Sequence, residues 1–203
     1  MILLTMLNNK PILRGQYLKL QQNLDPEYQN QAQALIDVGF INFVRQKTIK
    51  SLALYVARTY EVGTLTMIKY ALEHSIAVYL PKVNQDKTMD FYQIFNLEKD
   101  LTFNSALKIW EPVPNITSLL TQEIQLDAYF LPLICFDNRL NRIGSGQGYY
   151  DSYFKGRNYH GLVVGLAFET QRTKQLIDSE PFDQPLSAVI SEKEVYYRKL
   201  SEI

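Results

Sequence analysis

The pattern of apolar and polar positions predicts two helices before the first strand. A polar cap followed by a proline, which is the usual signal of a helix start, occurs at 8–11 and again at 25–26. Beyond the second start, apolar residues recur at helical spacing and predict one buried face. This stripe consists of Ala32, Leu35, Ile36, Phe40, Phe43 and Val44.

The rest of the chain alternates between short apolar runs, which predict strands, and segments with helical spacing. Buried strands are predicted at 51–56, 76–80, 128–136, 161–168 and 188–190, and a weaker strand at 89–94. Helices are predicted at 65–72, after Asn115 and from about Gly148. This alternation favours an α/β fold with a largely parallel sheet that helices cover on both faces. In such folds, ligands bind beyond the carboxyl ends of the strands.

Length, charge and cysteine content narrow the class of protein. The 203 residues fit one domain, and we expect residues 1–9 to be an extension in front of it. Because 21 basic and 21 acidic residues cancel, the total charge indicates neither a nucleic-acid-binding surface nor a polybasic membrane anchor. The longest apolar stretch, 128–136, is too short to span a bilayer. The single cysteine, Cys135, fits a reducing compartment, so we expect a cytoplasmic protein.

Residues 137–151 carry the clearest chemical signal. Three glycines at alternate positions, 144 to 148, stand between a predicted strand and a helix start, where their backbone amides can turn toward an anion. Arg142 is a planar donor for phosphoryl oxygens, and Asp151 is a hard oxygen ligand for magnesium. Asp137 is suited to cap the turn. These residues favour a nucleotide with a metal, although the spacing is that of neither a Walker loop nor a dinucleotide fingerprint, and a plain tight turn is the structural alternative.

The string Arg142-Ile143-Gly144-x-Gly146-x-Gly148-Tyr149-Tyr150-Asp151 closely resembles the signature of the 5-formyltetrahydrofolate cyclo-ligase family, whose members are also called methenyltetrahydrofolate synthetases. Further agreements follow in the expected order: Lys10-x-x-x-Arg14, Glu61-Val62-x-Thr64, Leu80-Pro81-Lys82-Val83, Met89-x-Phe91, Glu111-Pro112, and Leu166-Ala167-Phe168 with Gln171. The resemblance covers about residues 10–199.

The resemblance implies a three-layer α/β/α single domain over residues 1–203, of the NagB/RpiA/CoA-transferase-like type. It implies an enzyme that uses ATP and Mg²⁺ to convert 5-formyltetrahydrofolate to 5,10-methenyltetrahydrofolate, with release of ADP and phosphate. The substrate is expected with or without a polyglutamate tail, the enzyme as a monomer, and neither nucleic acid nor membrane as a partner. A kinase or ligase for another small acceptor, and a folate- or nucleotide-binding module without turnover, are the alternatives.

The resemblance also assigns roles to residues, with catalysis falling to Lys10 and Arg142. The nucleotide is expected on Lys10, Arg14, Arg142, Ile143, Gly144, Ser145, Gly146, Gln147, Gly148, Tyr149 and Tyr150. The folate is expected on Val56, Glu61, Met89, Phe91, Trp110 and Tyr150. Magnesium is expected on Asp151 and Asp183, although Phe182 stands where the family has histidine.

Taken singly, several of these residues have ordinary structural interpretations. Lys10 and Arg14 would form a solvated helix face, and Glu61 would belong to a helix start. Met89 and Phe91 would be core residues. The resemblance is what favours the functional interpretation of each.

Overall fold

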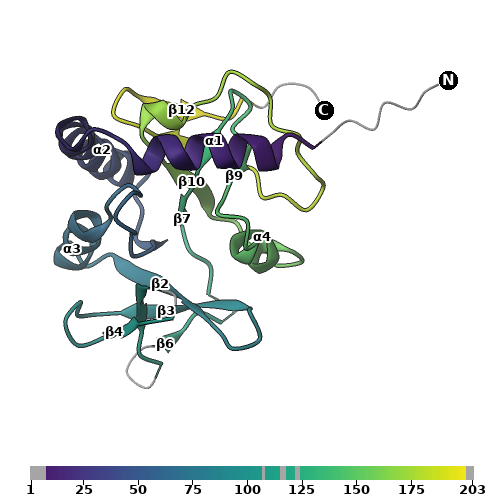
Figure 1. Ribbon diagram of the computed structural model, residues 1–203. Coiled ribbons are helices and arrows are strands. Elements are labelled where there is room, and N and C mark those ends of the chain that lie inside the picture. Colours follow the sequence, from purple (N-terminus) through teal and green to yellow (C-terminus); the bar gives the residue numbers. More distant parts are fainter. Residues whose placement is uncertain (1–7, 107, 115–117, 122–123, 200–203) are drawn as a thin grey trace.

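The computed structural model describes residues 8–106, 108–114, 118–121 and 124–199, and it shows a mixed α/β fold around one large sheet (Figure 1). The described helices are α1 (Lys10–Gln22), α2 (Pro26–Gln46), α3 (Leu65–Glu73), α4 (Tyr149–Phe154) and the 3₁₀ helix η1 (Glu169–Gln171). The described strands are β1 (Ser51–Ala53), β2 (Ala77–Val83), β3 (Met89–Ile94), β4 (Leu101–Asn104), β5 (Ile109–Pro112), β6 (Ser118–Leu119), β7 (Ala128–Pro132), β8 (Cys135–Phe136), β9 (Arg142–Ile143), β10 (Leu162–Leu166), β11 (Ala188–Ile190) and β12 (Val195–Tyr197).

The large sheet has the strand order β12-β11-β10-β7-β1-β2-β3-β6. Its central strands, from β11 to β2 in this order, pair in parallel, which confirms the predicted largely parallel sheet. The outer strands β12, β3 and β6 pair antiparallel. The chain returns from β2 to β3 through the short turn 84–88, and a connection of this length permits only an antiparallel pair. The ribbons β4–β5 and β8–β9 stand beside the sheet.

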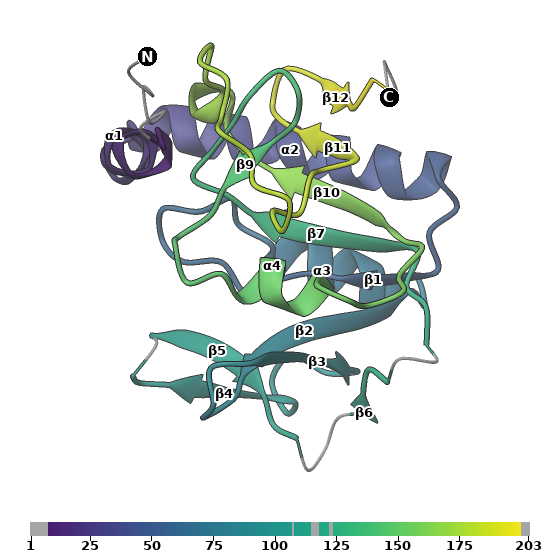
Figure 2. The ribbon, with the colours of Figure 1, turned by 90° about the vertical axis from the view of Figure 1, so that its right-hand side faces the viewer.

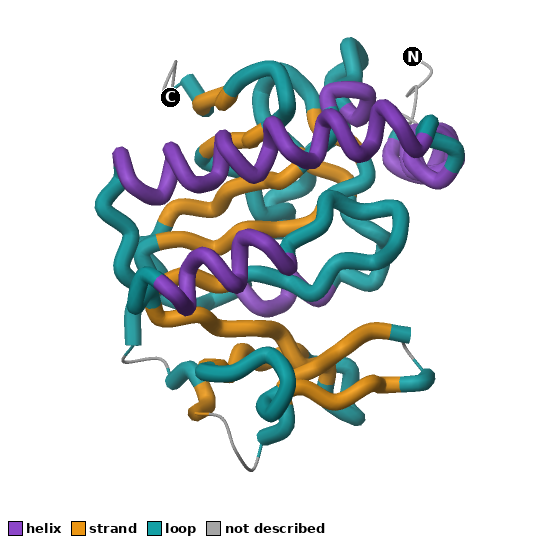
Figure 3. Tube along the Cα trace, turned by 90° about the vertical axis from the view of Figure 1, so that its left-hand side faces the viewer, coloured by secondary structure: helices purple, strands orange, loops and turns teal. Residues whose placement is uncertain are grey.

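Helices lie on both faces of this sheet. α2 and α3 cover one face (Figure 3), where they pack on strand residues such as Phe130 and Val164. α4 lies on the opposite face (Figure 2), where Tyr129 and Val163 point. Successive strand residues alternate between faces, so β7 and β10 each supply both cores. The predicted three layers are therefore present, and α1 packs separately through Leu13 near the β8–β9 ribbon.

The predicted apolar stripe on α2 is buried at every position except one. Leu35 is 55% exposed, so its prediction as a core residue was wrong. Consecutive helix residues are about 100° apart around the axis. Because Ile36 points directly into the core, its neighbour Leu35 is turned toward the outer side of the helix.

The run at 128–136, predicted as one strand, forms two. β7 ends at Pro132, and β8 begins after a break that contains Leu133 and Ile134. The carbonyls of these two residues accept hydrogen bonds of 2.6 and 3.1 Å from the side-chain amide of Gln171, which is fully buried. A polar side chain supplied from η1 thus replaces a neighbouring strand as the hydrogen-bonding partner, and the sheet pairing stops here.

Two further predictions fall partly on residues that are not described. Asn115 lies outside the described residues, but the helix expected after it was wrong for the described residues that follow, because 118–119 form the strand β6, which pairs with β3. Residues 1–7 of the expected extension also lie outside them. Among the helices that are described, none combines the length and the apolar character needed to cross a bilayer.

Gly161 and Gly15 provide a matched test of the packing. A Cβ atom at Gly161 would lie 2.3 Å from the carbonyl oxygen of Leu126, so we expect Gly161→Ala to lower the free energy of unfolding by about 1–3 kcal/mol. A Cβ atom at Gly15, on the exposed side of α1, meets nothing within 4 Å. Gly15→Ala should therefore raise the free energy by about 0.5–1 kcal/mol, because alanine favours the helix. Urea unfolding measures both variants, and a stabilising Gly161→Ala would contradict the packing described.

Candidate functional site

The predicted nucleotide residues gather around one cavity of about 290 Å³ beyond the carboxyl end of β7, which we call the glycine-loop cavity. Its walls come from the start of α1, residues 132–134, the loop 142–148, the start of α4 and residues 180–183. Every predicted nucleotide residue except Gln147 lines this cavity, and so do both predicted metal ligands.

The loop 144–148 has a backbone that requires glycine. Gly146 and Gly148 have φ angles of +95° and +70°, a region that residues with side chains rarely adopt. A Cβ atom at Gly146 would also lie 3.3 Å from the side chain of Arg14. Glycine is needed here both for the turn and for the close approach of α1.

A buried carboxylate fixes the turn that precedes this loop. Asp137 is fully buried, and its Oδ1 accepts hydrogen bonds from the backbone amides of Arg139 and Asn141, each at 2.9 Å. Its Oδ2 accepts one from the backbone amide of Ile177, also at 2.9 Å. The predicted turn-capping role of Asp137 is confirmed, and the same side chain holds the segment near 177 beside the loop.

Lys10 and Arg14 lie one helical turn apart on α1 and both face the glycine-loop cavity. Arg14 Nε donates to the carbonyl of Gly144 at 3.0 Å. Lys10 Nζ lies 2.5 Å from Asp183 Oδ2 and 2.7 Å from Glu180 Oε2. Burial lowers the pKa of Lys10, but the hydrogen bonds and charges of the two carboxylates outweigh it and raise the pKa overall. Lys10 is therefore a cation in this site.

Arg142 is a second cation of the cavity, held in place from two sides. Its Nη2 donates to Asp151 Oδ1 at 2.8 Å, and its guanidinium carbon lies 5.7 Å from the centroid of the Tyr150 ring. The Arg142 side chain is only 5% exposed, yet its buried Nε has no hydrogen-bond partner among the described residues. A buried donor of this kind is rare in folded proteins and indicates a missing acceptor.

The carboxylates of Asp151 and Asp183 lie on neighbouring segments. Asp151 Oδ1 also accepts a hydrogen bond of 3.1 Å from the backbone amide of Gln184, which follows Asp183 in the chain. In the part of the chain that is described, no group of three or more histidine, cysteine, aspartate or glutamate side chains is placed to hold a metal ion. Magnesium commonly takes only one or two carboxylates and fills its other positions with water and phosphate oxygens. These residues therefore fit magnesium together with an anionic ligand.

Glu61 stands where the glycine-loop cavity meets a second cavity of about 710 Å³, and it lines both. This second cavity, which we call the ribbon-side cavity, lies between α2, the segment 56–66 and the β4–β5 ribbon, and its wall is mostly apolar. Val56 and Trp110, two of the predicted folate residues, line it as well. Glu61 Oε2 accepts a hydrogen bond of 2.9 Å from the backbone amide of Arg58.

Met89 and Phe91 lie in the core rather than on a described cavity. Both are buried, and the Phe91 ring packs at 6.5 Å from the ring of Tyr150 and at 4.9 Å from that of Tyr153. Phe91 contacts the site through Tyr150, which lines the glycine-loop cavity. The predicted contact of Met89 and Phe91 with the folate stays a prediction.

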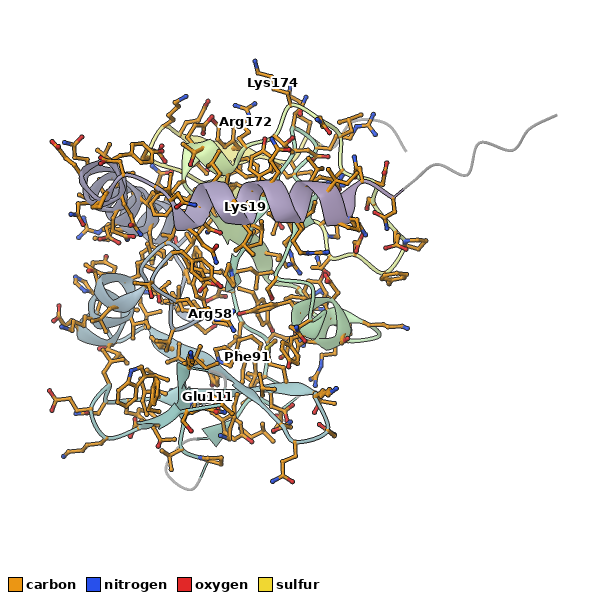
Figure 4. All side chains as sticks on the ribbon, in the orientation of Figure 1. Lys19, Arg58, Phe91, Glu111, Arg172 and Lys174 are labelled. Carbon is orange, nitrogen blue, oxygen red and sulfur yellow. The ribbon has the colours of Figure 1, made fainter. Side chains whose placement is uncertain are left out.

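The β4–β5 ribbon that carries Trp110 is attached to the sheet by a buried carboxylate. Glu111 is 1% exposed, accepts a hydrogen bond of 3.1 Å from the backbone amide of Val83 and lies 3.5 Å from Lys82 Nζ. Figure 4 labels Glu111 and Phe91 near each other at this end of the molecule. The motifs Leu80-Pro81-Lys82-Val83 and Glu111-Pro112, which were noted separately in the sequence, thus contact each other in the structure.

Three residues of the site were not singled out from the sequence: Gln33, Arg58 and Glu180. The side-chain amide of Gln33 exchanges two hydrogen bonds, of 2.9 and 2.7 Å, with the backbone of Gly63 and so fixes the segment that carries Glu61. Arg58 lines the ribbon-side cavity, and Figure 4 places it between α3 and α4. Of the three, only Glu180 had a signal in the sequence, its spacing of three residues from Asp183.

Comparison with known proteins gives a consistent result. The model of the 5-formyltetrahydrofolate cyclo-ligase family matches residues 6–192. The 5-formyltetrahydrofolate cyclo-ligase of Haemophilus influenzae is 29% identical over 179 residues, which cover 88% of this chain and 95% of that protein. The protein of the same name from Escherichia coli is 26% identical over 175 residues, covering 85% and 94% of the two chains.

Two solved structures are also similar. The NMR structure of the 5,10-methenyltetrahydrofolate synthetase of Aquifex aeolicus superimposes with a TM-score of 0.81 at 26% identity, over 96% of this chain and 95% of that one. The 5,10-methenyltetrahydrofolate synthetase of Mycoplasma pneumoniae gives a TM-score of 0.72 at 22% identity, over 91% and 99%. The latter agreement concerns the fold.

The environment of Glu61 predicts a pH-dependent stability. Burial raises the pKa of Glu61, and the Arg58 amide and charge offset this only in part. The folded protein therefore binds this proton more tightly than the unfolded chain, so stability is lost as the pH rises from the ordinary pKa of glutamate through the raised pKa. We expect Glu61→Gln to increase the Tm by about 2–4 °C at neutral pH, with the difference shrinking as the pH falls through that pKa.

Thermal unfolding across the acidic to neutral range measures this effect. Glu73→Gln, at the exposed end of α3, is the control and should leave the Tm unchanged. A Glu61→Gln protein that is less stable than the unchanged protein at neutral pH would show that the carboxylate is well solvated or well paired after all.

Proposed function

The chain belongs to the 5-formyltetrahydrofolate cyclo-ligase family, and on that premise we propose that it converts 5-formyltetrahydrofolate to 5,10-methenyltetrahydrofolate with the use of ATP and Mg²⁺. The observation that carries the proposal is the junction at Glu61, where a cavity walled by glycine amides and cations meets a larger, mostly apolar one. A charged nucleotide and a folate, whose ring system presents flat apolar faces, are the two substrates that such a pair of cavities suits.

The reaction explains why a phosphate donor is needed. The formyl oxygen on N5 is amide-like and leaves poorly as water or hydroxide. Transfer of the γ-phosphoryl group to this oxygen makes it a good leaving group, so N10 attacks the formyl carbon, the ring closes and phosphate departs. Phosphoryl transfer is catalysed mainly by alignment and by stabilisation of phosphate oxygens. The reaction therefore requires no serine or cysteine nucleophile.

In this proposal the phosphates of ATP bind in the glycine-loop cavity. The backbone amides of the loop 144–148 and the side chains of Lys10, Arg14 and Arg142 would bind the phosphate oxygens. The unpaired Nε of Arg142 supports this, because a phosphate oxygen is an acceptor that such a buried donor lacks. Arg142 and Lys10 would then stabilise the charge of the transferred group.

The charge of the cavity supports a divalent cation as part of the reaction. Among the residues that the structure describes, its lining contains three cations and four carboxylates, a formal net charge of −1. The carboxylates are Glu61, Asp151, Glu180 and Asp183, and the cations are Lys10, Arg14 and Arg142. A triphosphate is repelled by a negative lining, so it requires additional positive charge. Asp151 and Asp183 would hold the magnesium ion, which, when bound, neutralises charge on the phosphates.

The folate would bind from the ribbon-side cavity with its pterin end at Glu61. An ionised carboxylate accepts paired hydrogen bonds, and adjacent N–H groups on a pterin edge offer them. Val56 and Trp110 would cover the flat ring system, and Tyr150, which lines the glycine-loop cavity, would contact the ring beside the phosphates. The cavity of about 710 Å³ also leaves room for the longer part of the substrate, with or without a polyglutamate tail.

A ternary turnover assay tests the proposed function directly. We expect 5-formyltetrahydrofolate, ATP and Mg²⁺ together to yield the absorbance of the methenyl product, and the omission of any one to abolish it. ATP consumption that depends on a different acceptor would favour another kinase or ligase activity. Binding of both ligands by folded protein without product would favour a non-catalytic module.

Two substitutions test the division between the cavities. Asp151→Asn should weaken use of the magnesium–ATP complex about 10- to 100-fold with little change in the KM for formylfolate, because each charge-assisted contact contributes about 1.5–3 kcal/mol. Glu61→Gln should raise the KM for formylfolate by a similar factor and leave that for ATP nearly unchanged. Asp90→Asn removes a carboxylate from an ion pair with Arg157 and is the control. Equal effects of the two site substitutions on both substrates would contradict the assignment.

A further inference from the structure

The segment 176–184, which we call the strap, is fastened to the start of α1 beside the glycine-loop cavity. Asn9 makes three hydrogen bonds to it. Its backbone amide donates to Asp178 Oδ2 at 2.9 Å, its side-chain amide donates to the carbonyl of Leu176 at 2.7 Å, and its Oδ1 accepts from the backbone amide of Asp178 at 3.2 Å. The ion pairs of Lys10 with Glu180 and Asp183 are further links between the same two segments.

We propose that Glu180 is a positioning residue for Lys10: together with Asp183 it holds the Lys10 ammonium group in the ligand-free site, and loading of the nucleotide exchanges these partners. When the nucleotide binds, Lys10 pairs with a phosphate group, and the divalent cation replaces the ammonium group beside Asp183. The inference rests on the proposed function, since it takes ATP and Mg²⁺ as the ligands.

The contacts of Lys10 show why an exchange is required. The side chain is 9% exposed, and its Nζ already lies at hydrogen-bond distance from two carboxylates. A phosphate that approached Lys10 in this arrangement would come close to both carboxylates, and the repulsion would oppose the attraction of one ammonium group. Binding therefore has to separate Lys10 from at least one of them, or add positive charge, or both.

The two carboxylates differ in what else they do. Asp183 Oδ2 also accepts a hydrogen bond of 2.7 Å from the backbone amide of Glu180, which fixes Asp183 to the turn of the strap. The Glu180 side chain is 43% exposed and, among the described residues, bonds only to Lys10. Water can replace this partner when Lys10 moves, so Glu180 is the carboxylate that gives up the ammonium group, while Asp183 remains in the cavity.

This exchange makes the nucleotide and the metal depend on one another. Without a divalent cation, a nucleotide that draws Lys10 away leaves Asp183 uncompensated next to its phosphates. With the cation present, the lost ammonium contact at Asp183 is replaced. The arrangement thus disfavours metal-free ATP and selects the metal–nucleotide complex. The ion pairs of Lys10 in the ligand-free state have to break before the nucleotide binds well, and the metal replaces the contact that Asp183 loses.

Calorimetric titration of the full chain with the non-hydrolysable analogue AMP-PNP, with and without Mg²⁺, tests this inference. For Glu180→Gln we expect metal-free AMP-PNP to bind about 5- to 20-fold more tightly than to the unchanged protein, because one of two charged partners of Lys10 is removed. The affinity for the magnesium complex should rise by a similar factor, because Lys10 leaves Glu180 whether or not the cation is present. The preference for the magnesium complex over metal-free AMP-PNP should therefore persist in this variant, because that preference depends on Asp183.

Two further variants separate an exchange through Lys10 from a general effect of charge or of strap closure. In a Lys10→Met background, Glu180→Gln should change the affinity for metal-free AMP-PNP by less than about twofold, because the partner through which Glu180 acts is gone. Asp178→Asn alters the strap contact with Asn9 without touching Lys10, and both affinities should stay within about twofold of those of the unchanged protein. Thermal unfolding verifies that each variant is folded.

The outcomes distinguish the inference from the proposed function. Unchanged affinities in Glu180→Gln, an effect of equal size in the Lys10→Met background, or the same gain in Asp178→Asn would each overturn the inference while leaving ATP as a ligand. Unchanged, folded protein that binds AMP-PNP in neither condition would overturn both.

Discussion

The central strand β7 ends at Pro132, and the backbone groups freed where the chain leaves the sheet have to find hydrogen bonds inside the protein. Gln171 supplies donors to the two carbonyls that follow, and Asp137 supplies acceptors for the amides of the next turn. Both side chains are fully buried. These bonds lead the chain out of the sheet and back as β9, so the loop 144–148 lies next to the carboxyl end of the sheet and forms one wall of the glycine-loop cavity.

Within that cavity the charges are paired with one another. Arg142 is paired with Asp151, Lys10 with Glu180 and Asp183, and Arg14 donates to a backbone carbonyl. Such pairing stabilises charges that would otherwise be costly to bury. Within the described part of the chain, an anionic ligand finds a free donor in the Nε of Arg142, but to reach Lys10 it has to replace existing carboxylate partners. The proposed requirement for a metal and the ion pair of Glu180 with Lys10 are then both explained by the excess of carboxylates over cations among the described residues of the lining.

The second cavity depends on a different kind of support. Glu61 sits on a segment that Gln33 fixes to α2, and the facing ribbon is fixed to β2 by Glu111. Both anchors are polar side chains that bond to backbone groups, so they determine position without filling the cavity. Burial of Glu61 is unfavourable for the fold, since it raises the pKa of the carboxyl group. In the proposed reaction that group is available for a substrate that offers paired donors.

The sequence by itself determined the local elements and the chemical types at the site. The helix starts at Lys10 and Pro26, the strand at Met89–Ile94 and the glycine loop depend on neighbouring residues, and all were predicted. It did not determine that Leu35 faces outward or that the run at 128–136 breaks, because burial and strand pairing depend on distant partners such as Gln171. Only the tertiary structure brought Lys10 beside two carboxylates at least 170 positions away and joined two cavities at Glu61, because charge pairs form through space.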